Sequence, residues 1–352
     1  MTTQPASALH VQRTGEFRLE SGAILAELET AYVALGSLDA GRGNAVLVLH
    51  GYTTGPSMLD AGSNAAEGSW NGLVGPGRAI DTNRWFVICP NMLGSSYGST
   101  GPASIDPRSG ERYGANFPRI GVADIVAAQA RLVDALGIKR LAAVIGPSLG
   151  AMQAFEWATR YPERVARVVA AVGAPYRPQN VVPADVLLGQ LDDEPAWRDG
   201  DYARDPRSMI PWLTRQRIAT LDRYGVDAEL TPRIPGRDAR RAEIERLAAQ
   251  WAREFDAGAL LALARAVEHF DVRGRLAQMR APLLYVLARS DELFPPSLLH
   301  ELAPLFDAAG VSWSSLVLDS DKGHLASGAD SALWADALAT FLDAPAPGKR
   351  DS

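Results

Sequence analysis

Six short runs of apolar residues are spaced along the chain, and each is bounded by glycine, proline or polar residues. The runs cover residues 45–50, 84–90, 140–146, 167–173, 282–288 and 314–319. A strand that is buried on both faces does not alternate apolar with polar residues, so these continuous runs predict parallel strands. A weaker alternation over residues 23–33 predicts one further strand near the N-terminus.

Helix-length segments with apolar residues three and four positions apart lie between several of these runs. They cover residues 122–136, 149–160, 298–309 and 331–342. The first segment ends before Gly137 and the second before Tyr161 and Pro162, which are typical residues for ending a helix. Strands that alternate with helices predict an α/β fold, with a mostly parallel sheet covered by helices on both faces.

Residues 175–280 interrupt this alternation, because they contain charged helical patterns and no convincing buried strand. An insertion of this length is too long for a passive loop. We therefore expect an α/β core made of residues 1–174 and 281–352, with residues 175–280 forming a helical lid. A helical decoration or a dimer surface is the alternative role for the insertion, and the two roles are compatible.

The composition limits the partners that the chain could bind. Its 352 residues include 35 Lys and Arg against 41 Asp and Glu, for a net charge of −6. This balance argues against broad binding to nucleic acid or to an anionic membrane. No apolar run approaches the ~20 residues of a membrane span. The N-terminal segment also lacks the apolar centre of a signal peptide, so we expect a cytoplasmic protein.

Metal and disulfide chemistry are not indicated either. The single cysteine, Cys89, cannot form an intrachain disulfide or a zinc site built from cysteines. No spacing of histidine and acidic residues suggests another metal site. We therefore expect neither a metal nor a cofactor.

Residues 146–150 read Gly-Pro-Ser-Leu-Gly and join the third apolar run to a predicted helix. This G-x-S-x-G pattern between a strand and a helix is typical of a nucleophile elbow, a sharp turn that exposes the serine hydroxyl above the sheet. The flanking glycines remove side chains that would clash in the turn. Ser148 is therefore the candidate nucleophile, and the N–H of Leu149 should point at an oxyanion from the start of the helix.

A serine nucleophile needs a base, and in chains with this elbow the acid and then the histidine follow the serine. Of the five histidines, this order leaves His269, His300 and His324. The first two fall within helical patterns. His324 lies in a loop bounded by glycines, directly after the last predicted strand, and is the candidate base.

The candidate acid is Asp291, which follows the fifth apolar run by three residues and so lies at the carboxyl edge of the sheet. It would hold the imidazole tautomer and stabilise the imidazolium. Glu292 is its neighbour and a weaker candidate. Asp319 and Asp321 are too close to His324 in the sequence for the usual geometry.

A second oxyanion donor is expected from the loop after the first apolar run, at residues 49–55. The N–H of Tyr52 is our first choice, with Thr53 next. We interpret His50 in this loop as a packed, hydrogen-bonded anchor rather than a catalytic group.

Taken over most of its length, the chain resembles the homoserine O-acetyltransferase group of the α/β-hydrolase superfamily. The likeness lies in the stretch that follows Ser148 and in residues 71–114, 117–138, 193–202 and 290–296. The resemblance implies the α/β-hydrolase fold, a catalytic triad of Ser148, Asp291 and His324, a helical lid and a homodimer formed through the lid.

Three positions depart from the pattern of that family. The elbow has Gly-Pro-Ser-Leu-Gly where the transferases carry Gly-Gly-Ser-Met-Gly, and Leu325 replaces the aspartate that contacts the substrate amine. The arginine that pairs with the substrate carboxylate falls, by counting back from Pro195, at Leu188. Two leucines would leave both charges of an amino acid desolvated and unpaired, so we take Leu188 and Leu325 as residues of an apolar substrate pocket.

The sequence therefore predicts a serine hydrolase that cleaves small, apolar carboxylic esters through an acyl-enzyme, with water as the acceptor. The alternative is an acyl-CoA-dependent O-acyltransferase with an alcohol acceptor other than homoserine, which shares every step through the acyl-enzyme. A non-catalytic ligand-binding protein is a third hypothesis, and the three candidate catalytic residues argue against it. Under the ester-hydrolase hypothesis, the binding partner is a small-molecule ester.

Overall fold

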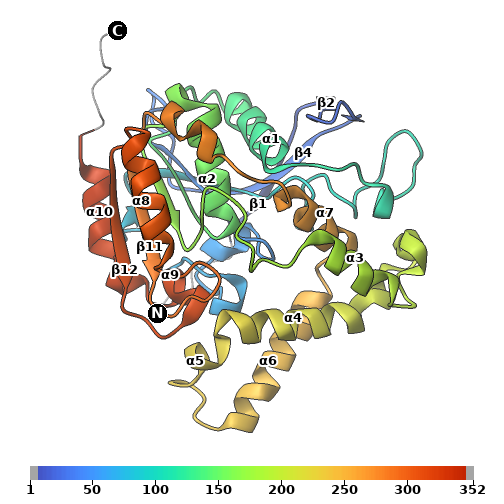
Figure 1. Cartoon of the computed structure of the whole chain (residues 1–352). Helices are drawn as coiled ribbons and strands as arrows, with labels where there is room; N and C mark the ends of the chain where they lie inside the picture. Colours follow the sequence, from blue (N-terminus) through green and yellow to red (C-terminus); the bar gives the residue numbers. More distant parts are fainter. Residues whose placement is uncertain (1–6, 346–352) are drawn as a thin grey trace.

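An eight-stranded, mostly parallel sheet forms the centre of the molecule (Figure 1). The computed structural model describes residues 7–345, so the first six residues of the segment searched for a signal peptide lie outside it. The strands lie in the order β1-β4-β8-β5-β9-β10-β11-β12. β4 is antiparallel to both of its neighbours, β1 and β8, and the other pairs are parallel.

Six of these strands, β5 and β8 to β12, match the six predicted runs to within a few residues. The eight strands of the sheet are β1 (Leu9–Arg13), β4 (Glu29–Leu35), β5 (Ala45–Val48), β8 (Phe86–Pro90), β9 (Ala143–Pro147), β10 (Val168–Ala171), β11 (Leu283–Ala288) and β12 (Trp313–Leu318). Two small two-stranded sheets pair β2 (Phe17–Arg18) with β3 (Ile24–Leu25) and β6 (Val74–Gly75) with β7 (Ile80–Asp81). The edge strand β1 was not predicted, because Leu9 and Val11 are exposed and the strand carries no buried apolar pattern.

The central strands are buried on both faces. In β11, Tyr285 and Leu287 point into one hydrophobic core, and Val286 and Ala288 point into another on the opposite face. Each strand therefore contributes apolar side chains to two cores, which explains its continuous apolar sequence. The predicted fold class, a mostly parallel sheet with helices on both faces, is confirmed.

Helices cover both faces of this sheet (Figure 1). α1 (Val122–Ala135), α2 (Leu149–Arg160) and α8 (Leu298–Ala308) pack into the first core, whereas α10 (Ala335–Asp343) packs into the second. α9 (Ala326–Ala329) is a single short turn. α10 begins four residues later than the pattern predicts, because Ser331–Leu333 forms a 3₁₀ turn ahead of it.

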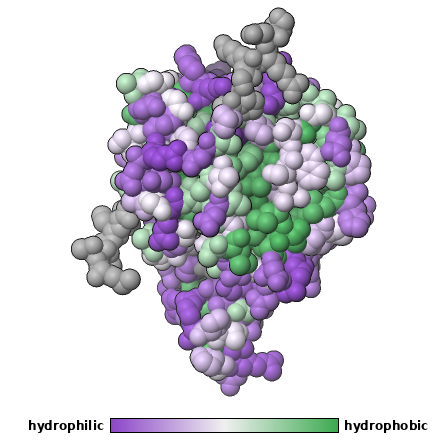
Figure 2. Space-filling model, turned by 90° about the vertical axis from the view of Figure 1, so that its left-hand side faces the viewer, coloured by the Kyte–Doolittle hydropathy of each residue, from purple (hydrophilic) through white to green (hydrophobic). Residues whose placement is uncertain are grey.

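The residues between β10 and β11 are helical, as the sequence indicates. They form α3 (Ala184–Asp192), α4 (Ile210–Tyr224), α5 (Val226–Leu230), α6 (Arg237–Ala252) and α7 (Ala257–Val267). The end of the molecule that carries α5 and α6 protrudes from it, and its surface is largely hydrophilic (Figure 2). α7 differs, because almost all of its residues are buried and belong to the first core. The insertion is thus partly an exposed appendage and partly core.

A chain of buried hydrogen bonds links α1 and α2 to the loop after β5. The indole Nε1 of Trp157 donates to Oε1 of Gln129 at 2.8 Å, and Nε2 of Gln129 donates to Oε1 of Gln153 at 2.6 Å. Nε2 of Gln153 then donates to the carbonyl of His50 at 3.2 Å. Buried polar groups need such partners, so this chain fixes the loop relative to both helices.

His50 ends this chain as a neutral, fully buried side chain. Its Nδ1 lies 2.9 Å from the Gly51 carbonyl, and its Nε2 accepts a hydrogen bond from the N–H of Met92 at 3.3 Å. Nδ1 therefore carries the proton. Burial lowers the pKa of His50 to about 4, against hydrogen bonds that raise it. The interpretation of His50 as a packed loop anchor is confirmed.

We predict that His50 makes the protein less stable as the pH falls from 7 toward 4. Between its ordinary pKa of 6.5 and its folded value of about 4, the unfolded chain binds the extra proton, so the free energy of unfolding decreases with decreasing pH. The full effect is on the order of 3 kcal/mol. Urea unfolding of the wild type and of His50→Gln between pH 7 and pH 4.5 measures it. The wild type should lose more stability over this range, and equal losses would contradict the prediction.

Candidate active site

Ser148 occupies a strained turn between β9 and α2. Its backbone has φ 57° and ψ −121°, in the left-handed range that residues with side chains rarely adopt. A Cβ atom at Gly146 would lie 2.7 Å from the carbonyl oxygen of Leu49, and one at Gly150 would lie 2.2 Å from it. Both flanking glycines are therefore required by close backbone packing. The structure thus has the geometry of the predicted elbow.

The side chains of Ser148, His324 and Asp291 form one hydrogen-bonded row at the carboxyl edge of the sheet. Nε2 of His324 lies 2.9 Å from Oγ of Ser148, and Nδ1 of His324 lies 2.9 Å from Oδ2 of Asp291. Only 2% of Asp291 and 7% of His324 is exposed. The other candidates lie elsewhere, because Glu292, His269 and His300 are exposed to solvent.

Asp291 is held as a carboxylate. Burial raises its pKa. The charge and hydrogen bond of His324 and the hydrogen bonds from the N–H groups of Leu293 and Phe294 lower the pKa by more than burial raises it, so it lies below its ordinary value. The two N–H groups donate to Oδ1 at 2.9 and 3.3 Å. The other carboxylate oxygen accepts a hydrogen bond from the N–H at Nδ1 of His324, which leaves Nε2 free to accept one from the serine hydroxyl.

Two aromatic rings flank the imidazole of His324. The ring of Tyr224, at the end of α4, lies 4.8 Å from it, and the ring of Phe294 lies 5.6 Å from it, measured between centroids. One ring comes from the insertion and the other from the loop after Asp291. The imidazole is therefore fixed by packing as well as by its two hydrogen bonds.

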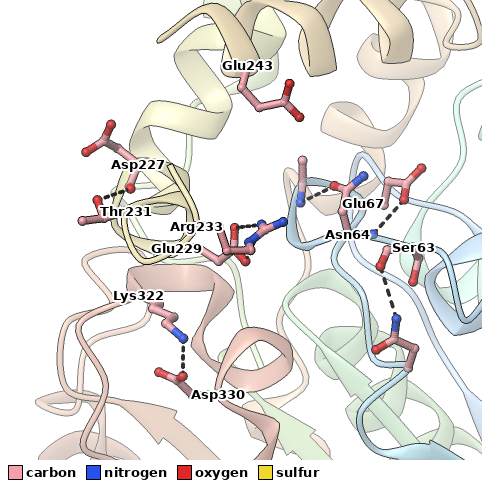
Figure 3. Close-up of polar contacts among 12 residues, drawn as sticks. Ser63, Asn64, Glu67, Asp227, Glu229, Thr231, Arg233, Glu243, Lys322 and Asp330 are labelled. Carbon is pink, nitrogen blue, oxygen red and sulfur yellow. Dashed lines mark hydrogen bonds and ion pairs between the residues drawn. The ribbon is translucent and has the colours of Figure 1, made fainter. Parts of the chain in front are cut away.

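The loop that carries His324 is itself tied down (Figure 3). The ammonium of Lys322 pairs with Asp330, and both residues lie beneath α5. Glu229 of α5 forms a separate ion pair with Arg233 at 2.9 Å. The N–H of Gly323 donates to Oγ of Ser290 at 2.9 Å. These contacts join the histidine loop to its own neighbours and to the loop that follows β11.

Tyr52 and Leu149, the predicted oxyanion donors, lie close to Ser148. Both residues border the same cavity as Ser148. Within the described range, neither N–H has a hydrogen-bond acceptor, and the first residue of a helix has none of its own. Ser148 borders two cavities, and Tyr52 borders both of them whereas Thr53 borders only the smaller one, so we keep Tyr52 as the first choice.

The loop at residues 51–55 is bound to the insertion through its side chains and backbone. The hydroxyl of Tyr52 donates to the carbonyl of Leu260 in α7. The indole of Trp251 in α6 donates to the carbonyl of Thr53 at 2.9 Å, and Arg217 in α4 donates to the Thr53 hydroxyl. Three helices of the insertion therefore hold the loop that carries the Tyr52 N–H.

Two cavities meet at Ser148. The smaller has a volume of about 50 Å³ and is bordered by His324, Leu325 and the Thr53 loop. The larger, of about 340 Å³, is bordered by Leu149 and by residues of α3, α4 and α7. Tyr52, Ser148 and Tyr224 border both. The serine hydroxyl therefore has room for a substrate group on two sides.

The two tentative pocket residues have different positions. Leu325 borders the smaller cavity next to His324, as expected. Leu188 borders neither cavity and packs against the first core, whereas Leu187 and Gln190 of the same helix border the larger cavity. The structure therefore does not bring Leu188 to either cavity. Successive residues of a helix point about 100° apart, so an error of one position in counting changes the face.

A buried arginine that the sequence analysis missed lies beside the smaller cavity. Arg217 is 2% exposed and donates to Thr53 and to the carbonyl of Ala66, which both border that cavity. Its guanidinium lies 4.9 Å from the ring of Trp251, and no carboxylate of the described residues lies within 4 Å of it. Burial lowers its pKa. Arg217 falls four residues after the buried Leu213, so the helical spacing of α4 could have revealed it.

Among residues 7–345, no group of three or more His, Cys, Asp and Glu side chains is arranged to hold a metal ion. In the same range, none of the helices has the length and apolar character needed to cross a membrane.

Comparisons with known proteins agree with this architecture. The family described as the alpha/beta hydrolase fold matches residues 44–328. The homoserine O-acetyltransferase of Geotalea daltonii is 37% identical over 330 residues, which is 88% of this chain and 90% of that protein. The corresponding enzyme of Geobacter metallireducens is 36% identical over 93% of this chain and 94% of its own length.

Solved structures give the same picture. The homoserine O-acetyltransferase of Bacillus anthracis superposes with a TM-score of 0.83 at 25% identity, covering 97% of this chain and 99% of that one. The esterase E22 superposes with a TM-score of 0.82 at 25% identity, covering 96% of this chain and 100% of that one. The chain therefore belongs to the homoserine O-acetyltransferase group of the α/β-hydrolase fold family.

Proposed function

We propose that the protein is an O-acyltransferase that carries the acyl group on Ser148 and passes it from a thioester such as acyl-CoA to an alcohol. The observation that carries this proposal is the hydrogen-bonded row of Asp291, His324 and Ser148 at the elbow. The names of the relatives that match most of the chain support transfer to an alcohol over transfer to water.

The proposed reaction has two half-reactions. His324 accepts the proton of Ser148 as Oγ forms a bond to the thioester carbonyl carbon, and Asp291 stabilises the imidazolium. The N–H groups of Leu149 and Tyr52 bind the oxyanion. When the carbon–sulfur bond breaks, His324 gives its proton to the thiol. An alcohol then gives its proton to His324, attacks the acyl-enzyme and leaves as the ester, while Ser148 regains the proton.

The acceptor is proposed to be an alcohol without an ammonium group. Leu325 stands beside His324, where the family carries an aspartate that contacts the substrate amine, and the residues that border the smaller cavity include no acid. An ammonium group placed there would be desolvated without a partner. Arg217, on the other hand, is a buried cation close to the same cavity and would tolerate a carboxylate on the acceptor.

Ester hydrolysis is the second candidate function, and it is the function that the sequence predicts. It uses the same acyl-enzyme with water as the acceptor, and the apolar Leu325 at the site favours it. The likeness to esterase E22 supports it as well. The cytoplasmic location and the homodimer formed through the insertion, α3–α7, remain predictions from the sequence.

Removing the nucleophile or the base should abolish acyl-enzyme formation. We expect Ser148→Ala and His324→Ala to lower kcat to a similar extent, by about 10⁴-fold or more, because such residues act as a unit. Hydrolysis of an activated acetyl ester and labelling by a fluorophosphonate probe measure this. The exposed His300→Ala is the matched control and should retain wild-type activity. Labelling that persists in Ser148→Ala would overturn the assignment and support a non-catalytic role for the elbow.

Three matched alcohols should separate the two candidate functions and test the acceptor. Homoserine carries an ammonium and a carboxylate group, 4-hydroxybutanoate carries only the carboxylate, and butan-1-ol carries neither. With acetyl-CoA or hexanoyl-CoA as donor, we expect one of the last two to raise thiol release at least about tenfold more than homoserine does, because an unpaired ammonium group costs more than 1.4 kcal/mol.

Thiol release that no alcohol accelerates would instead establish hydrolysis. Release that homoserine accelerates most would show that the chain binds the ammonium group through residues other than Leu325.

A further inference from the structure

We propose that the larger cavity at Ser148 binds the acyl chain of the substrate, and that the protein therefore prefers medium-length acyl groups of about six to ten carbons over acetyl. The inference rests on the proposed acylation of Ser148. It assigns a specificity to the cavity that the triad alone does not define.

The positions of the catalytic groups decide which side of the substrate enters which cavity. Nε2 of His324 must deliver its proton to the leaving oxygen or sulfur, so the leaving group lies on the side of His324. His324 borders the smaller cavity and not the larger one. The oxyanion points at the N–H groups of Tyr52 and Leu149. The remaining substituent of the carbonyl carbon, the acyl chain, is then directed into the larger cavity.

The larger cavity is built to hold an apolar chain. α7 contributes Leu260, Ala264 and Val267, which recur at spacings of four and three and so share one helix face. The other apolar residues come from α2, from α3 and its approach, and from the loop after Asp291: Met152, Val181, Val182, Leu187, Leu293 and Phe294. Burying each methylene against such a surface favours binding by about 0.8 kcal/mol, or roughly three- to fourfold.

Apart from Tyr52, Ser148 and Gln190 of α3, the polar side chains that border this cavity lie on one helix. Gln216, Thr220 and Arg223 project from a single face of α4, together with Ala219. An acyl chain would therefore contact apolar side chains from α7 and α3 and leave the polar face of α4 to water. The volume of about 340 Å³ far exceeds what an acetyl methyl group requires, whereas the smaller cavity has about 50 Å³.

Two isomeric esters test the assignment, because they differ only in which side carries the chain. Methyl heptanoate places the chain on the acyl side, and hexyl acetate places it on the alcohol side. In the acylation step the Ser148 Oγ–carbon bond forms, the carbon–oxygen bond to the alcohol breaks, and the serine proton passes through His324 to that alcohol. We expect methyl heptanoate to acylate Ser148 at least about tenfold faster than either hexyl acetate or methyl acetate. Intact-protein mass spectrometry measures the rate at which the acyl adduct forms.

A pair of variants on α7 makes the test specific to the cavity. Ala264→Leu fills the larger cavity and should slow acylation by methyl heptanoate at least about tenfold, with less than about twofold effect on methyl acetate. Ala262→Leu is the matched control: the same change on the same helix, at a residue that does not border the cavity and should leave the ratio unchanged. Where Ala264→Leu does not fold, Ala219→Leu on the exposed part of α4 replaces it.

The outcomes separate this inference from the proposed function. Faster acylation by hexyl acetate would show that the larger cavity holds the alcohol side and would overturn the assignment, as would an unchanged heptanoate-to-acetate ratio in Ala264→Leu. Absence of any adduct on Ser148 with every ester would instead refute the acyl-enzyme itself.

Discussion

The turn at Ser148 is the constraint on which the active site depends. A positive φ at a residue with a side chain is costly, and it persists only where the surroundings fix it. Here the backbone of Leu49 passes within 2.2 Å of where a Cβ on Gly150 would be, and a Cβ on Gly173 would lie 2.8 Å from the carbonyl of Ser148. Glycines thus let β5, β9 and α2 approach closely enough to force the turn. The same turn exposes the serine hydroxyl and directs the Leu149 N–H at the reaction.

The helical insertion completes the site rather than simply covering it. Tyr52 and Thr53, in the loop opposite the elbow, are bonded to α4, α6 and α7, and Tyr224 of α4 packs on the imidazole of His324. Both the predicted oxyanion loop and the histidine are therefore positioned from two sides. α7 is itself buried in the first core, so its contact with this loop connects the loop to that core.

The proposed choice of acceptor rests on where charges lie in the site. The row of Asp291 and His324 supplies the charge that catalysis requires, and it lies on one side of Ser148. The smaller cavity next to it has Leu325 and no acid along its border, while the buried cation Arg217 stands behind Thr53. In the proposed function, acyl-enzyme formation depends on the first group and the choice of acceptor on the second.

The sequence by itself determined the strands, most helices and the order of the chemical groups. Continuous apolar runs mark strands buried on both faces, and the strand–turn–helix context of residues 146–150 identifies Ser148. Asp291 and His324 follow from chain order and from their places after β11 and β12, because the carboxyl ends of parallel strands meet at one edge.

Only the tertiary structure decided which face of each insertion helix reaches the serine. Leu188 packs against the first core and borders neither cavity at Ser148, and the buried cation is Arg217 on a different helix. The edge strand β1 also became visible only through its pairing with β4. The physical reason is the same in each case. The local pattern of apolar and polar residues predicts a helix or strand when the burial of its faces is regular. Contacts between elements far apart in the chain depend on how those elements pack, and no local pattern contains that information.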